Sequence, residues 1–204
     1  HVAAESDGMR FSLHTPKGDV DCFLGLPGRH NVANAVAASA IATEAGAGLQ
    51  SIRDALAAVK SVAGRLCPRQ GIKGASLLDD SYNASPSSFR VAIDVLSDIA
   101  RDSNQSSIVI MGDMAELADQ AIFAHREVGR YAREKGITMF WTVGEFSRFA
   151  SEEFGDSAKH FATIEELCEH ARQVLSNAVL VLIKGSRSAG MDLVADCLIK
   201  GEKH

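Results

Sequence analysis

The stretch ASLLDDSYNASPSSFRVAIDVLSDIARDSNQSSIVIMGD, residues 75–113, decides the fold of this chain. It begins with a short apolar run at 75–80 and ends with a second one at 106–113. Between them, Pro86 stands where the first turn of a helix accepts proline, and apolar side chains then recur at helical spacing. A strand, a helix and a second strand in this order are typical of a parallel βαβ unit.

The same alternation continues toward the end of the chain. Further apolar runs that are typical of strands lie at 138–144, 160–162 and 178–185. Amphipathic segments that we expect to form helices lie at 86–101, 120–136, 145–155, 163–177 and 189–200. This pattern predicts an α/β fold in which a doubly wound, mostly parallel sheet is covered by helices on both faces.

The first part of the chain has a different pattern. Residues 9–26 alternate apolar and polar side chains on both sides of the turn sequence TPKGD, which predicts a β-hairpin. An Ala-rich helix is expected over 31–48 and a second helix over 49–62. Pro68 and neighbouring glycines then interrupt the pattern, so we place a domain boundary near residue 66.

Composition excludes several classes of protein. The 204 residues are 46% hydrophobic and 23% charged, as in an ordinary folded domain, and the net charge of −5 disfavours a broad nucleic-acid-binding face. The four cysteines show no CxxC spacing, so we expect reduced thiols and no metal site. Neither a signal peptide nor a membrane-spanning segment is encoded, so we expect a cytoplasmic protein.

Loops that follow parallel strands are where ligands bind in such sheets. In DDSYNASP, residues 79–86, the Asp80 carboxylate can accept hydrogen bonds from ribose hydroxyls, and the following helix N-terminus can hold an anion. The alternative is a structural turn with Ser85 as the helix N-cap, and for Ser85 alone this alternative is favoured.

The second candidate loop is KGSRSAGM, residues 184–191. Lys184 and Arg187 beside a helix N-terminus can hold a phosphate or carboxylate group. In the alternative interpretation Ser188 caps the helix and both cations point into water.

Other polar residues are less specific signals. His30, Asn31 and Asn34 open the Ala-rich helix, and the Asn34 carboxamide can pair with an adenine edge, although helix capping by Asn31 explains the same residues. Arg65 can reach a nucleotide or pair with an acid. We expect His125 to be a packed or an exposed side chain rather than a catalytic one, because no catalytic motif accompanies it. Neither GxxxxGK[ST] nor GxGxxG occurs in the sequence.

Taken together, LPGRHNVANAVAA (26–38), GRL (64–66), LLDDSYNASPSSF (77–89), MGDMAEL (111–117) and IKGSRSAGM (183–191) resemble the Mur ligase family in content and order. The resemblance spans almost the whole chain. It implies that residues 1–66, a hairpin with helices, are the C-terminal part of a central ATPase domain. It also implies that residues 67–204 are a C-terminal Rossmann-like domain.

The resemblance also implies an activity. It is closest to family members in which ATP phosphorylates the terminal carboxylate of UDP-MurNAc-tripeptide and D-Ala-D-Ala attacks the acyl phosphate, a step of peptidoglycan precursor synthesis. ATP and Mg²⁺ are the implied cofactors, with the metal ligands and the phosphate loop expected upstream of this chain. The implied partners are the two substrates and the upstream segments, with no nucleic acid. The chain alone is therefore expected to be inactive.

Individual roles follow from the resemblance residue by residue. It implies ATP contacts for His30, Asn31, Asn34, Arg65 and Asp80. It implies substrate contacts for four further residues, namely Asn83, Ser85, Lys184 and Arg187. No catalytic side chain or metal ligand is assigned within the chain.

Two residues depart from the family pattern, and one alternative function stays open. Ala118 follows GDMAEL where glycine is usual, and Ser85 stands where asparagine is usual. These departures bear on the geometry of one loop and on one substrate contact. The alternative is a free-standing, non-catalytic module of doubly wound fold that binds a nucleotide or a peptide.

Overall fold

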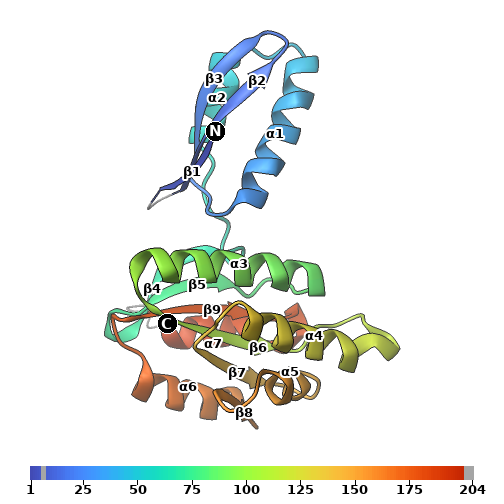
Figure 1. The fold of residues 1–204 in the computed structure, drawn as a ribbon, viewed down its shortest axis with the longest axis vertical. Coiled ribbons are helices and arrows are strands. Elements are labelled where there is room, and N and C mark those ends of the chain that lie inside the picture. The colour runs from blue at the N-terminus through green and yellow to red at the C-terminus, as the bar shows by residue number, and fades with distance from the viewer. Residues whose placement is uncertain (6–7, 200–204) are drawn as a thin grey trace. The chain divides into compact units, whose positions relative to one another are not determined.

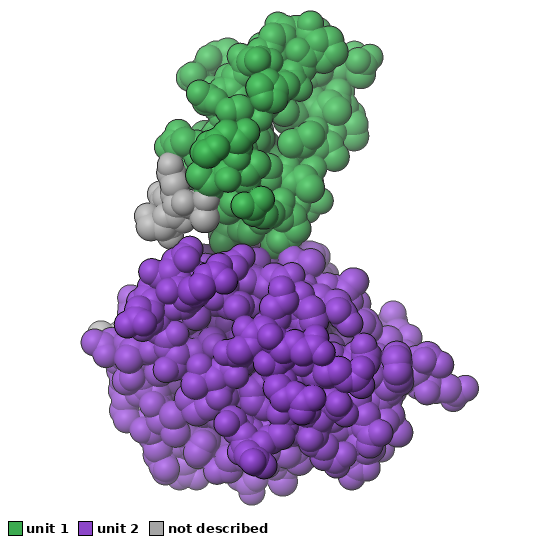
Figure 2. Space-filling view, viewed as in Figure 1, with its two compact units in different colours: residues 1–61 green, residues 62–204 purple. Residues whose placement is uncertain are grey.

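A computed structural model of the chain describes residues 1–5 and 8–199 (Figure 1). The chain forms two compact units, residues 1–61 and residues 62–204 (Figure 2). Within the described residues, no helix is long and apolar enough to span a membrane.

The first unit packs two helices on a three-stranded antiparallel sheet with the order β1-β2-β3. Its elements are β1 (Val2–Glu5), β2 (Gly8–Thr15), β3 (Gly18–Leu24), α1 (Arg29–Glu44) and α2 (Leu49–Ala57). The predicted hairpin is confirmed, because Thr15 pairs with Gly18 across the turn and the register runs back to Met9 and Leu24. Strand β1 was not predicted, since only four residues form it.

Helix α1 is apolar on more than one side. Val32 and Ala35 are buried against the sheet, whereas Val36 and Ile41 leave 43% and 73% of their surface exposed. The buried Ser39 hydroxyl donates to the Ala35 carbonyl oxygen at 2.7 Å, which satisfies it within the helix. The Ala-rich sequence therefore forms the predicted helix and also leaves apolar side chains on its outer surface.

The second unit is built on a six-stranded sheet with the order β4-β5-β9-β6-β7-β8. Its strands are β4 (Cys67–Gln70), β5 (Ser76–Asp80), β6 (Ser106–Gly112), β7 (Met139–Val143), β8 (Ala158–Phe161) and β9 (Val179–Lys184). Its helices are α3 (Pro86–Ser103), α4 (Ala121–Glu134), α5 (Ser147–Phe154), α6 (Ile164–Val174) and α7 (Met191–Leu198). Strand β4 is antiparallel to β5, and the other neighbours are parallel.

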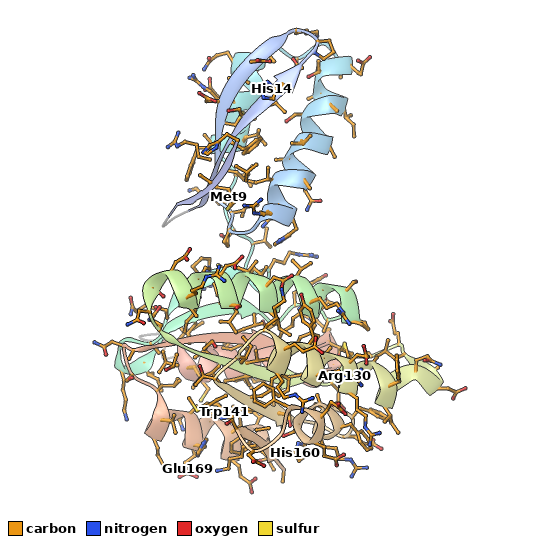
Figure 3. The ribbon with its side chains drawn as sticks, viewed as in Figure 1. Met9, His14, Arg130, Trp141, His160 and Glu169 are labelled. Atoms are coloured by element: carbon orange, nitrogen blue, oxygen red, sulfur yellow. The ribbon has the colours of Figure 1, made fainter. Side chains whose placement is uncertain are left out.

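Helices cover both faces of this sheet, as the sequence predicts. Along β9, Leu180 and Leu182 pack under α3, α4 and α5, whereas Val181 and Ile183 pack against α6 and α7. This alternation is the two-residue period of a strand that is buried on both faces. Trp141 of β7, labelled in Figure 3, is 2% exposed and belongs to the core on the α6 side.

Strand β4 was also not predicted from the sequence. Its four residues include Pro68, and its side chains alternate between half-buried and exposed positions. Proline is tolerated on an edge strand because an edge strand need not donate every backbone hydrogen bond. The segment that follows the predicted domain boundary therefore adds one antiparallel edge strand to the parallel sheet.

The loop after β6 contains a strained residue. Ala118 adopts a φ of 43°, in the left-handed region that favours glycine. Alanine therefore occupies a backbone conformation here that glycine adopts without strain.

Replacing Ala118 with glycine is expected to stabilise the protein. The left-handed conformation costs a non-glycine residue about 1–2 kcal/mol, and part of this cost is offset by the greater freedom of glycine in the unfolded chain. We expect the free energy of unfolding to rise by about 0.5–1 kcal/mol in urea titrations. Ala115→Gly is the control, because Ala115 is exposed but has no positive φ, and it should not stabilise. Equal effects of the two substitutions would contradict this explanation.

Candidate functional site

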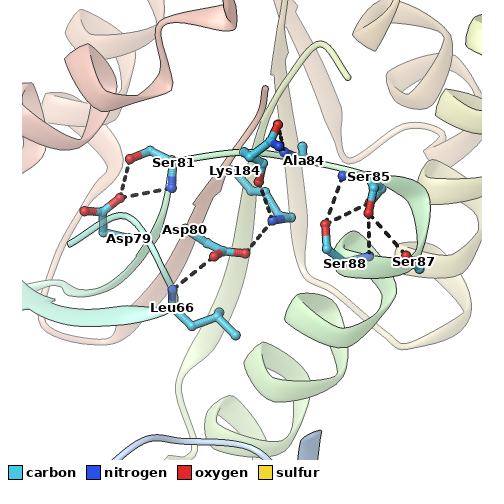
Figure 4. Close-up of polar contacts among 10 residues, drawn as sticks. Leu66, Asp79, Asp80, Ser81, Ala84, Ser85, Ser87, Ser88 and Lys184 are labelled. Atoms are coloured by element: carbon cyan, nitrogen blue, oxygen red, sulfur yellow. Dashed lines mark hydrogen bonds and ion pairs between the residues drawn. The ribbon is translucent and has the colours of Figure 1, made fainter. Parts of the chain in front are cut away.

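The carboxyl ends of β5 and β9 lie side by side, and the parallel register pairs Asp80 with Lys184. Both side chains are on the α3 face, since Leu78 and Leu182, two residues earlier on each strand, pack in the core under α3. Lys184 Nζ donates to Asp80 Oδ2 at 2.6 Å and to the Asn83 carbonyl oxygen at 2.9 Å (Figure 4). The two candidate loops are thus joined by an ion pair.

This ion pair is largely removed from water. The side chain of Lys184 is 2% exposed and that of Asp80 is 13% exposed. Burial raises the pKa of the Asp80 carboxyl and lowers the pKa of the Lys184 ammonium, while their mutual attraction opposes both shifts. The lysine ammonium also lies 5.5 Å from the centroid of the Phe89 ring. Lys184 therefore does not point into water, which contradicts that part of the alternative interpretation.

Two neighbouring carboxylates hold the turn at residues 64–66. Asp80 Oδ1 accepts from the Leu66 N–H at 3.0 Å, and Asp79 Oδ2 accepts from the Gly64 N–H at 3.1 Å. Gly64 has a φ of 73°, and a Cβ at this position would lie 3.1 Å from the Tyr82 backbone nitrogen. Glycine is required here because the turn needs both a left-handed conformation and a close approach to the 79–82 segment.

The turn presents Arg65 at the surface beside an exposed aromatic ring. The Arg65 guanidinium carbon lies 4.5 Å from the centroid of the Tyr82 ring, and that of Arg187 lies 5.7 Å from the same centroid. Tyr82 is 45% exposed, and both arginines are exposed. Two cations thus approach one phenol at the carboxyl end of the sheet, which is an arrangement suited to an anionic ligand.

Ser85 is the N-cap of α3, as the structural alternative predicts. Its hydroxyl accepts from the Ser88 N–H at 3.2 Å, and the Ser88 hydroxyl accepts from the Ser85 N–H at 2.9 Å. This reciprocal pair is a capping box (Figure 4). The Asn83 side chain is exposed and its Oδ1 accepts from the Ala84 N–H at 2.8 Å. This bond uses only the oxygen of the side-chain amide, so the amide nitrogen can still donate to a ligand.

The loop after β9 does not have the helix cap that the alternative interpretation predicts. Ser188 is not the N-cap of α7, because a short 3-10 turn over Arg187–Ala189 precedes that helix and Gly190 occupies the cap position. The Ser188 hydroxyl instead lies 3.1 Å from that of Ser186. Gly190 has a φ of 65°, which explains why glycine rather than serine begins the helix.

The candidate nucleotide residues of the first unit lie at the start of α1. The N-cap is Gly28, and no side chain caps the helix there, so the alternative in which Asn31 caps the helix is wrong. The Asn31 amide instead donates to the Pro27 carbonyl oxygen at 2.7 Å. Asn34 is exposed one turn later, whereas His30 is half-buried.

Asp113, at the carboxyl end of β6, is a structurally important residue that was not among the candidates from the sequence. Its Oδ1 accepts from the Ser147 N–H at 2.7 Å and the Phe146 N–H at 3.1 Å, and its Oδ2 accepts from the Glu145 N–H at 2.9 Å. Gly144 must be glycine, because a Cβ there would lie 2.4 Å from Asp113 Oδ1. The position of Asp113 after a buried strand is the signal that could have found it, as for Asp80.

His125 is packed in the interior, which is one of the two alternatives that the sequence left open. It is fully buried, and its Nε2 accepts from the Met114 N–H at 3.0 Å. Its Nδ1 lies 2.6 Å from the Ala121 carbonyl oxygen, so Nδ1 carries the proton and the imidazole is neutral. Burial lowers the pKa of His125, and nearby Asp113 opposes this shift only in part.

We expect His125 to make the second unit less stable in acid. The unfolded chain binds this proton more readily than the folded one, so stability is lost as the pH falls below about 6.5, by at most about 1.4 kcal/mol per pH unit. Urea titrations followed by circular dichroism at pH 7.5 and 5.5 measure this loss. His125→Gln should show a smaller loss between the two pH values, whereas His170→Gln should not abolish it. An identical pH dependence in His125→Gln and the unsubstituted chain would count against this assignment.

The described residues contain no group of three or more His, Cys, Asp or Glu side chains that could hold a metal ion. Cys22 and Cys168 are buried, Cys67 and Cys197 are half-buried, and all four are free thiols, as predicted.

Comparison with known proteins gives the class of this chain. Residues 64–187, more than half of the chain, match the family model described as Mur ligase, glutamate ligase domain. The chain therefore belongs to the Mur ligase family, and the resemblance seen in the sequence is confirmed.

Individual relatives point to one branch of the family. The chain is 39% identical over 200 residues to the UDP-N-acetylmuramoyl-tripeptide–D-alanyl-D-alanine ligase of Escherichia coli, an alignment that covers 97% of this chain and 43% of the relative. A crystal structure of MurF from Acinetobacter baumannii matches with a TM-score of 0.84 and 32% identity, covering 97% of this chain and 43% of that one. MurF from Thermotoga maritima in complex with ADP has the same fold, with a TM-score of 0.81 at 18% identity, over 97% of this chain and 44% of that one. The chain thus spans less than half the length of these relatives.

Proposed function

We propose that this chain is part of an ATP-dependent amide-bond ligase that joins D-Ala-D-Ala to UDP-MurNAc-tripeptide in peptidoglycan precursor synthesis. The observation that carries the proposal is the identity of 39% to the Escherichia coli ligase over 97% of the chain. The ion pair between Asp80 and Lys184 also supports it, because this pair joins the loops DDSYNASP and KGSRSAGM. We further propose that residues 1–66 are the end of the central ATPase domain and that residues 67–204 are the C-terminal domain, in a cytoplasmic enzyme.

The two exposed arginines at Tyr82 fit the phosphate groups of ATP or the carboxylate of the incoming dipeptide. A guanidinium donates two parallel hydrogen bonds to either group, and the aromatic ring orients it. We propose Arg65 for ATP, and Arg187 with Asn83 for the substrate. Ser85 is proposed for the same substrate contact, although its hydroxyl already accepts from the Ser88 N–H.

The buried side chains of Lys184 and Asp80 hold in place the loops that carry these residues. The ion pair uses Asp80 Oδ2, and the Leu66 N–H uses Oδ1, so the carboxylate fixes the turn that carries Arg65. A carboxylate has further lone pairs, so Asp80 can also accept from a ribose hydroxyl. Lys184 binds the Asn83 carbonyl oxygen and thereby fixes the loop that carries the proposed substrate contacts.

The remaining proposed ATP contacts lie in the first unit. Exposed Asn34 has the donor and acceptor pair that an adenine edge requires, and we assign His30 and Asn31 to the same motif. ATP would supply the energy for amide-bond formation. The described residues offer no donor set for Mg²⁺, so we derive no step through the metal in this chain.

The test is an activity assay on the natural full-length polypeptide that contains this chain. We expect ADP release that requires both UDP-MurNAc-tripeptide and D-Ala-D-Ala, and a product whose mass equals the two joined substrates minus water. The 204-residue chain alone should release no ADP. Failure of the full-length protein to form the product would overturn the proposal, and ATP binding without any ligation would favour the non-catalytic module.

Arg187→Gln in the full-length enzyme tests the site itself. Losing one charge-assisted contact of about 1.5–3 kcal/mol should raise the KM for D-Ala-D-Ala by about 10- to 100-fold. Arg101→Gln is the matched control, because Arg101 is an exposed arginine in the last turn of α3 and not in the loops after β5 and β9. Equal kinetics for the two variants would remove Arg187 from the site.

A further inference from the structure

Two cysteine side chains meet where α6 packs against α7, on the face of the sheet that α3 does not cover. Cys168 on α6 is 4% exposed, and Cys197 on α7 is half-buried. The two thiols lie close enough to interact with each other, and both are free. Neither residue contributes to the site at Asp80 and Lys184.

A cation lies next to one of the two sulfur atoms. Arg172 Nη2 donates to Cys197 Sγ at 3.1 Å, and Arg172 follows Cys168 by one turn of α6. Arg172 therefore holds the Cys197 sulfur beside α6, the helix that carries Cys168. Burial and the neighbouring Cys197 raise the pKa of Cys168 to about 12, so Cys168 keeps its proton. The pair thus contains an accessible sulfur beside a cation and a buried thiol as its neighbour.

We propose that Cys168 and Cys197 are a site of reversible oxidation by hydroperoxides and form an intramolecular disulfide. The Cys197 sulfur attacks one peroxide oxygen and the O–O bond breaks, so that Cys197 becomes a sulfenic acid and the other oxygen leaves as water with the thiol proton. The Cys168 sulfur then attacks the Cys197 sulfur, an S–S bond forms, and the hydroxyl group leaves as water with the thiol proton. In total, two thiols and one hydrogen peroxide give one disulfide and two waters. A small thiol such as glutathione reverses the reaction by exchange.

The position of the pair gives the disulfide a structural effect. It would link α6 covalently to α7, and the chain between them contains β9 and the loop with Lys184 and Arg187. A crosslink around this segment restricts the unfolded chain and holds α7, which begins directly after that loop.

The experiment oxidises the purified 204-residue chain with hydrogen peroxide at neutral pH. We expect the intact mass to fall by two hydrogen atoms. Tryptic digestion should then yield a crosslinked pair of peptides, residues 160–172 and 188–200, that dithiothreitol separates. We also expect a higher thermal midpoint for the oxidised chain and its return on reduction.

Three variants make the test specific. Cys197→Ser should abolish the crosslink, and Cys67→Ser, at another half-buried cysteine, should leave it unchanged. Arg172→Gln should slow the loss of thiols, because it removes the guanidinium that contacts the Cys197 sulfur. Circular dichroism checks that each variant is folded.

Several results would overturn the proposal. One is that all four thiols survive an excess of peroxide, and another is that the disulfide contains Cys22 or Cys67 or joins two chains. Oxidation of Cys197 beyond the sulfenic acid, with Cys168 still free, would show that the buried thiol does not resolve it. Equal rates for Arg172→Gln and the unsubstituted chain would overturn the assignment of Cys197 as the attacking sulfur.

Discussion

Replacing Lys184 with methionine should lower the free energy of unfolding of the second unit by about 3–5 kcal/mol. Methionine fills a similar volume but leaves Asp80 as an uncompensated carboxylate that is only 13% exposed. It also leaves the Asn83 carbonyl oxygen without its ammonium donor. Urea titration followed by the fluorescence of Trp141 measures this loss, because the single tryptophan of the chain lies in the core of this unit.

The pH dependence of this variant has a definite sign. Burial raises the pKa of Asp80, so the folded state holds the proton more tightly than the unfolded state, and this group favours folding in acid. Without Lys184 the carboxylate loses the ammonium that lowers its pKa, so the deficit of Lys184→Met should shrink as the pH falls through the range in which Asp80 takes up its proton. A deficit that grew in acid would contradict this account.

Two further variants separate the buried charge from the loss of a side chain. Lys184→Met combined with Asp80→Asn should recover part of the stability, because no carboxylate is then left without its partner. Lys135→Met is the control, since Lys135 pairs with Asp94 at the surface and both side chains are more than a third exposed. We expect it to change stability by about 1 kcal/mol or less.

Gly129→Ala should destabilise the same unit by about 3 kcal/mol. An added Cβ would lie 2.1 Å from the Ala150 carbonyl oxygen, which is backbone and cannot rotate away. Helices α4 and α5 therefore leave no room for a side chain between Gly129 and Ala150. In an exposed helix the same change would stabilise by up to about 1 kcal/mol, because alanine has the higher helix propensity. The sign of the effect therefore distinguishes packing from propensity.

The control for Gly129→Ala is a substitution at an exposed position of α4. Arg133→Ala should change stability by about 0.5 kcal/mol or less in the same urea titration. If Gly129→Ala were neutral or stabilising, α4 and α5 would not pack with their backbones in contact.

The sequence predicted most of the second unit because its central strands are buried on both faces. Continuous apolar runs such as SSIVIMGD and AVLVLIKG mark such strands without ambiguity when helices separate them. The edge strands β1 and β4 escaped prediction because four residues carry too little periodicity, and Pro68 argues against a strand unless it lies at an edge. Pattern alone also does not give strand order.

Strand order explains what could and could not be predicted of the site. Asp80 and Lys184 were each candidates because they end buried strands, but they lie 104 residues apart. Their pairing requires β9 to lie beside β5, which the tertiary structure decides. The sequence therefore suggested a lysine for an external anion, whereas the structure pairs its ammonium with a carboxylate of the same chain. Ser85 was predicted as an N-cap because capping depends only on local sequence.

The place of β9 also has a consequence for synthesis. It is the last of the six strands to leave the ribosome, yet it lies between β5 and β6. Until it emerges, those two strands lack the neighbour that pairs with both, and their edges are open to other nascent chains. Folding of this unit is therefore postponed until β9 has been synthesised. A polypeptide that terminates early, before β9, would present two open edges to chaperones and proteases.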